Sequence, residues 1–165
     1  AMSTALIVIP CVSASARAAV EQLLETIPGH PEVKIVDNAS RTVLAAADIC
    51  IVKAGTSTLE AMLLRRPMVV AYRLGALTHL IVRRLIKIPH VALPNLLGGR
   101  RLVPEFLQKE ATVENLSKAL IGVSKTGAKE KRQFDLIHRE LRRNASAKAA
   151  EAVLRLYKSK YGNGS

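Results

Sequence analysis

The chain has 165 residues, which is room for one domain of ordinary size. Hydrophobic residues make up 49% of it and can form a buried core. Aromatic residues make up only 3%, which excludes a protein that stacks single-stranded nucleic acid on aromatic rings. The net charge is +12, with net −2 over residues 1–64 and net +7 over each of 65–124 and 125–165. This charge predicts a phosphate-rich partner: a nucleic acid, an anionic membrane or a phosphorylated ligand.

The first two thirds of the chain alternate short apolar runs with amphipathic segments. Strands are expected over residues 5–10, 33–36, 48–52, 68–72 and 91–93. Helices are expected over 13–27, 41–47, 56–64 and 74–87. Strands and helices that alternate at this pace predict βαβ units and a parallel sheet.

After Pro94 the pattern becomes helical, with no further strand expected. The predicted helices cover 102–109, 113–123, 129–143 and 145–157. The fold class is therefore α/β, a Rossmann-like parallel sheet with flanking helices, followed by an all-helical C-terminal segment. We divide it into a domain over 1–110, helices over 111–157 and a disordered tail over 158–165.

Two cysteines, Cys11 and Cys50, each lie within an apolar run and are expected to be buried, reduced thiols. No apolar stretch reaches the roughly 18–20 residues of a membrane span, and the run at 5–9 is too short for a signal peptide. A cytoplasmic protein is expected.

The most informative junction is at residues 51–60, where a buried strand ends, Gly55 permits a tight turn and Thr56, Ser57 and Thr58 open a helix. A helix N-terminus at the carboxyl end of a parallel strand suits phosphate. The alternative is purely structural, because Ser57 and Glu60 have the spacing of a capping box.

Two further segments combine polar and basic residues. Residues 93–101 are expected to form a loop on the carboxyl side of the sheet, where Asn95 offers a donor and an acceptor and Arg100 and Arg101 suit phosphate; the alternative is a solvated surface loop. Residues 76–88 are expected to form a basic amphipathic helix, which suits either an anionic membrane or packing against the protein's own core. The four histidines have no metal-site spacing, and no catalytic base is identified.

The motifs at 54–63, 66–73 and 93–108, taken in order, resemble those of the lipid-A-disaccharide synthases, glycosyltransferases with the two-domain GT-B fold. The third reads Leu-Pro-Asn-Leu-Leu-Gly-Gly-Arg-Arg-Leu-Val-Pro-Glu-Phe-Leu-Gln. The resemblance continues through 134–141 and 149–154, and runs from about residue 5 to about residue 157.

The resemblance implies transfer of 2,3-diacylglucosamine from UDP to 2,3-diacylglucosamine 1-phosphate, with release of UDP. No cofactor is implied. The partners would be this UDP-sugar donor, the acylated acceptor, an anionic membrane surface of a Gram-negative bacterium and, as an option, a second copy. The expected nucleotide-binding residues are Gly55, Thr56, Ser57, Glu60, Asn95, Gly99 and Arg100. The expected lipid contacts are Arg83, Arg84 and Lys87, which would place the protein peripherally at the inner membrane.

The sequence departs from the family's pattern in two places. Ala54 stands where the family usually has serine. The family also has a strand, a Gly-Ser-Arg loop and a helix before the strand at 5–10, and an acceptor domain that carries the catalytic carboxylate. The sequence contains none of these segments. We therefore expect an inactive fragment that holds part of the donor site, has no catalytic residue, and leaves a sheet edge exposed so that it self-associates.

Two other functions remain open. One is another GT-B enzyme, such as the transferase that adds GlcNAc to a lipid-linked peptidoglycan precursor, although the 93–101 motif argues against it. The other is a basic module without catalysis that binds nucleic acid through the helical C-terminus, which salt-dependent DNA retention without a UDP effect would favour.

Overall fold

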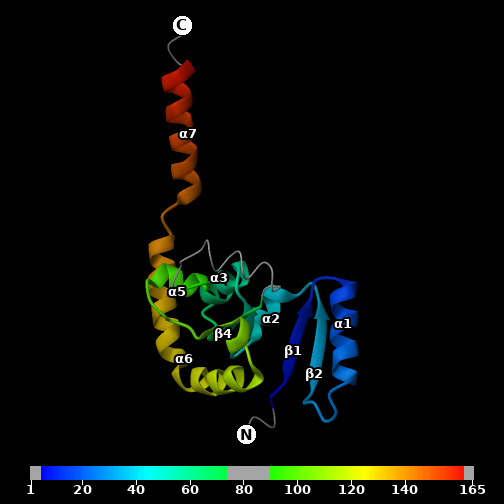
Figure 1. Ribbon diagram of the computed structural model, residues 1–165. Helices are drawn as coiled ribbons and strands as arrows, with labels where there is room; N and C mark the ends of the chain where they lie inside the picture. Colours follow the sequence, from blue (N-terminus) through cyan, green and yellow to red (C-terminus); the bar gives the residue numbers. More distant parts are fainter. Residues whose placement is uncertain (1–4, 74–89, 162–165) are drawn as a thin grey trace.

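The computed structural model describes residues 5–73 and 90–161 (Figure 1). Its strands are β1 (Ile7–Cys11), β2 (Val33–Asp37), β3 (Cys50–Lys53), β4 (Met68–Tyr72) and β5 (Glu105–Leu107). Its helices are α1 (Ala14–Glu25), α2 (Ser40–Ala46), α3 (Thr56–Leu63), α5 (Leu93–Gly98), a 3₁₀ turn at Gln108–Glu110, α6 (Val113–Leu141) and α7 (Ala145–Tyr161). The predicted α/β class with a helical C-terminal segment is confirmed.

Two predictions after residue 90 are wrong. Residues 91–93 form no strand; instead α5 begins at Leu93, because Pro94 at its first turn has a φ suited to a helix start. Residues 105–107 form β5 rather than a helix, because they pair with the free edge of β4, which outweighs their helical propensity.

The C-terminal helices are longer than predicted. The two helices expected over 113–123 and 129–143 are one helix, α6, in which Gly127 lies against Pro67. Helix α7 continues to Tyr161, four residues into the segment expected to be disordered. The helix predicted over 74–87 lies outside the described residues.

The five strands form two parallel sheets rather than one. One has the order β1-β2 and the other β3-β4-β5. In Figure 1, β1 lies between β2 and the three-stranded sheet. No described strand pairs with the second edge of β1, which lies on the side of the three-stranded sheet, or with the second edge of β3. Ile7 on β1 is 41% exposed and Ile51 on β3 is 52% exposed, as expected for a sheet edge without its neighbour.

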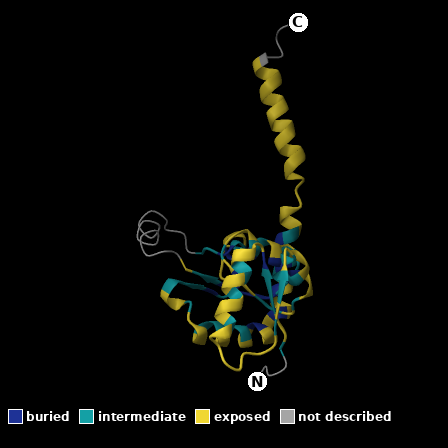
Figure 2. Cartoon of the chain, turned by 90° about the vertical axis from the view of Figure 1, so that its right-hand side faces the viewer, coloured by how far each residue is buried: buried dark blue, intermediate teal, exposed yellow. Residues whose placement is uncertain are grey.

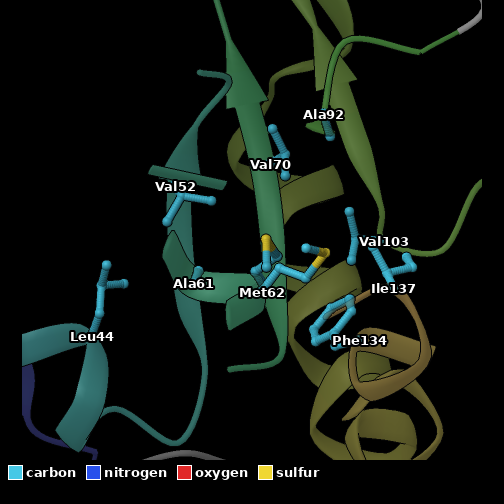
Figure 3. Close-up of a cluster of buried hydrophobic side chains, with 10 residues drawn as sticks. Leu44, Val52, Ala61, Met62, Val70, Ala92, Val103, Phe134 and Ile137 are labelled. Carbon is cyan, nitrogen blue, oxygen red and sulfur yellow. The ribbon is translucent and has the colours of Figure 1, made fainter. Parts of the chain in front are cut away.

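The hydrophobic core lies between the three-stranded sheet and helices α3 and α6. Figure 3 shows Met62 of α3 and Phe134 of α6 side by side below Val70 of β4, all three fully buried. Burial of a side chain such as Phe134 contributes about 1.5–3 kcal/mol. The core therefore fixes α3, and with it the first turn of that helix, against the sheet.

The last helix extends away from the rest of the molecule (Figure 1). Residues 145–160 of α7 are all exposed, including Val153, Leu154 and Leu156 (Figure 2). Asn144, with a positive φ of 52°, separates it from α6. Among the described helices none is both long and apolar enough to cross a membrane.

Candidate functional site

The carboxyl ends of β3, β4 and β5 meet at one edge of their sheet, because the three strands are parallel. Ligands of parallel α/β sheets bind outside this edge. Lys53, the last residue of β3, lies with its Nζ 5.6 Å from the ring centre of Tyr72, the last residue of β4. Arg73 follows and donates a hydrogen bond to the Ala111 carbonyl at 2.8 Å. Two positive charges therefore lie at this edge.

A glycine turn leads from β3 into α3. Gly55 is the N-cap residue with φ 148° and ψ −160°, a conformation that L side chains rarely adopt. No side chain caps the helix. The N–H groups of Thr56 and Ser57 have no partner within the helix and lie at the positive end of the helix dipole, whereas the N–H of Thr58 donates to the Gly55 carbonyl at 3.1 Å.

The alternative interpretation of this motif, a capping box between Ser57 and Glu60, is wrong. The helix begins at Thr56, so Ser57 lies inside it, and its hydroxyl donates to the Lys53 carbonyl at 3.0 Å. Thr56 and Glu60 are exposed one turn apart on the same helix face. Among the described residues, none forms a hydrogen bond or an ion pair with the Thr56 hydroxyl or the Glu60 carboxylate.

Asn95 has a different environment from the one expected. It is fully buried in α5. Its Oδ1 accepts from the N–H groups of Leu102 and Val103 at 2.6 and 2.8 Å, and its Nδ2 donates to the Val103 carbonyl at 3.0 Å. The amide therefore holds the turn that leads to β5, and a contact with a nucleotide stays a prediction.

The structure places Arg100 away from the glycine turn. Gly99 ends α5 in the left-handed conformation, and Arg100 donates to Gln133 of α6 at 2.6 Å. One turn before Gln133, the carboxyl of Glu130 accepts from the N–H of Met68, the first residue of β4. Residues 93–101 are thus not a loop on the carboxyl side of the sheet, because α5 leads away from it toward the amino end of β4.

Three residues of this region were not among the expected nucleotide-binding residues: Thr58, Gln108 and Glu105, which begins β5. Gln108 directly follows β5 with φ 53°, a strained conformation of the kind found at functional sites. Glu105 is buried; burial raises the pKa of its carboxyl, but hydrogen bonds from Ala92, Val91 and His90 outweigh this and lower it. Glu105 and Gln108 were missed because residues 102–109 were predicted to form a helix.

Other candidates lie elsewhere. Arg83, Arg84 and Lys87 are outside the described residues. Within the described ranges no three His, Cys, Asp or Glu side chains gather as metal ligands. Both cysteines are free thiols, but only Cys11 is buried as expected, and Cys50 is partly buried. Burial still raises the pKa of Cys50 to about 11, so it stays protonated near pH 7.

The strands and the glycine turn define a Rossmann-like α/β fold with an open helix N-terminus at the carboxyl edge. The family model of lipid-A-disaccharide synthetase matches residues 1–156, and the chain belongs to this family.

Similar proteins include lipid-A-disaccharide synthases of three bacteria. The chain is 50% identical to one of Pseudomonas putida over 155 residues, which is 93% of this chain and 40% of that protein. It is 49% identical over 149 residues to those of Pseudomonas aeruginosa and Azotobacter vinelandii, covering 90% of this chain and 39% of each. The chain therefore spans about 40% of the length of these relatives.

Proposed function

We propose that the chain forms part of a glycosyltransferase that makes the lipid A disaccharide precursor. The reaction would transfer 2,3-diacylglucosamine from its UDP derivative to 2,3-diacylglucosamine 1-phosphate and release UDP. Membership of the family and the named relatives support this activity. The chain would supply part of the UDP site.

The observation that carries the proposal is the uncapped first turn of α3 at the carboxyl edge of the sheet. Its free N–H groups and the Thr56 hydroxyl would donate hydrogen bonds to the diphosphate, and the Ser57 hydroxyl would close the turn behind them. The Glu60 carboxylate, one turn later on the same face, would accept hydrogen bonds from the ribose hydroxyls. Lys53 and Arg73 add positive charge nearby.

The other expected residues would contribute less directly. Asn95 would shape the site through the backbone of residues 102–103, rather than by contact. Gly99 would end α5 so that Arg100 meets α6. Gln108, at the end of β5, is a candidate for contact with the donor sugar.

We propose peripheral attachment to an anionic membrane, where the acylated acceptor would reside. The described part of residues 125–165 carries 11 basic and 4 acidic groups, and α7 exposes Val153, Leu154 and Leu156. Cationic and apolar side chains on one helix suit such a surface. The same apolar residues would also suit a second copy of the chain in a homodimer.

Calorimetric titration with UDP tests the donor site. We expect Glu60→Gln to weaken UDP binding about ten- to a hundredfold, the value of a charge-assisted hydrogen bond. Glu25→Gln, at the exposed end of α1, is the matched control and should bind like the unchanged chain. Equal affinity for all three proteins would contradict the ribose role of Glu60, and salt-dependent DNA binding without UDP binding would favour the nucleic-acid module.

A further inference from the structure

Two buried polar side chains connect α3, β5 and the segment that enters α5. Thr58, in the first turn of α3, is fully buried, and Glu105, the first residue of β5, is 9% exposed. Both form hydrogen bonds with the segment that enters α5. Neither belongs to the exposed face of α3 that Thr56 and Glu60 form.

The Thr58 hydroxyl makes two hydrogen bonds at once. Its Oγ1 donates to the carbonyl of Gly55 at 2.7 Å and accepts from the N–H of Leu93 at 3.3 Å. The first bond holds the N-cap peptide of α3, and the second holds the first residue of α5. The hydroxyl thus fixes the glycine turn against a segment 35 residues further along the chain.

Glu105 holds the residues just before Leu93. Its Oε2 accepts from the N–H groups of Val91 and Ala92 at 3.0 and 2.9 Å, and its Oε1 accepts from Nδ1 of His90 at 2.7 Å. Ala92 is also part of the hydrophobic core, near Val70 (Figure 3). The start of α5 is therefore fixed on one side by Glu105 and on the other by Thr58.

We propose that Thr58 and Glu105 are positioning residues that hold the Gly55 turn in the arrangement that binds an anion, without touching the ligand themselves. The proposal rests on the proposed UDP site. A phosphate that binds to free N–H groups gains most when these groups already point at it, because no ordering of the turn then opposes binding. Thr58 supplies this order from behind the turn, and Glu105 holds the segment that Thr58 is bonded to.

The chemistry of Thr58 allows a sharp test. Thr58→Val keeps the shape of the side chain but has no hydroxyl, and Thr58→Ser keeps the hydroxyl. Thr42→Val, on an exposed part of α2, is the matched control for loss of a threonine hydroxyl. Amide hydrogen exchange is measured in the whole chain without ligand, and UDP affinity is then measured for each variant well below its unfolding temperature.

In Thr58→Val we expect faster exchange at Leu93 and at residues 55–58, with amides of β4 unchanged, and UDP binding weaker by about tenfold. Thr58→Ser should restore both properties. Glu105→Gln should speed exchange at Val91 and Ala92 and also weaken UDP binding.

Two results would overturn the positioning role. One is normal exchange at Leu93 and residues 55–58 in Thr58→Val. The other is altered exchange with full UDP affinity, which would make the two hydrogen bonds purely structural. Failure of the proposed function gives a different result, because the unchanged chain itself would then bind neither UDP nor inorganic pyrophosphate. That outcome removes the anion-binding role, while the exchange data still report the hydrogen bond between Thr58 and Leu93.

Discussion

Replacement of Glu130 by glutamine should stabilise the protein, and only above about pH 5. Glu130 lies in α6 and is 8% exposed, and its Oε2 has no hydrogen-bond partner in the described structure. Burial raises the pKa of its carboxyl from 4.5 to about 7, although hydrogen bonds from the Met68 N–H and the Thr126 hydroxyl act in the opposite direction. The folded protein therefore binds this proton more tightly than the unfolded chain does.

The size of the effect follows from the pKa difference. A shift from 4.5 to about 7 corresponds to about 3 kcal/mol, at roughly 1.4 kcal/mol per unit. Stability is lost as the pH rises from 4.5 and levels off above about 7, because the charged carboxylate is the form that burial disfavours. A neutral glutamine resembles the protonated carboxyl and avoids this loss.

Urea unfolding, followed at the NMR amide signals of β4 between pH 4 and 8, measures the effect. The free energy of unfolding of Glu130→Gln should match that of the unchanged protein near pH 4 and exceed it by about 3 kcal/mol at pH 8. Glu140→Gln, exposed near the end of α6, is the control and should show no such trend. A difference between Glu130→Gln and the unchanged protein that does not vary with pH would refute the reasoning.

Two substitutions test the packing around the site. Gly127→Ala should destabilise the protein by about 1–3 kcal/mol, because the new methyl group would lie 2.7 Å from Pro67. Gly122→Ala, in open space on the same helix, is the control and should not destabilise it. Equal urea unfolding midpoints for the two variants would contradict the contact with Pro67. Asn95→Ala should cost about 2 kcal/mol or more, because it leaves the N–H groups of Leu102 and Val103 buried without an acceptor. An unfolding temperature within one degree of that of the unchanged chain would show that water replaces the amide.

The first four strands and three helices could be predicted because each has its own local pattern. The run at 68–72 is continuously apolar and is β4 to the residue. Strand β5 has only three residues and begins with Glu105, a charged residue in a buried position, so its pairing with β4 leaves no pattern in the sequence. The continuous α6 was missed because a glycine such as Gly127 usually interrupts a helical pattern in a sequence. In the fold, Gly127 lies inside the helix and lets it pack closely against Pro67.

The candidate site was predictable to the same degree. The turn at Gly55 could be located, because a glycine followed by hydroxyl residues after a buried strand predicts a turn into a helix from the local sequence alone. The hydrogen-bond partners of the Asn95 and Arg100 side chains could not be inferred, because they depend on where residues 102–103 and α6 lie in the fold. Thr58 was one of three adjacent hydroxyl residues, and only its contact with Leu93 distinguishes it.

The division of the strands into two sheets has a consequence for cooperativity. In residues 5–37, Cys11 is the only buried hydrophobic residue, and α1 has none. No backbone hydrogen bond between strands joins this part to the three-stranded sheet, and α2 contacts both β1 and α3. The amino-terminal unit is therefore expected to open at lower denaturant than the sheet around β4, so that one unfolding free energy does not describe the whole chain.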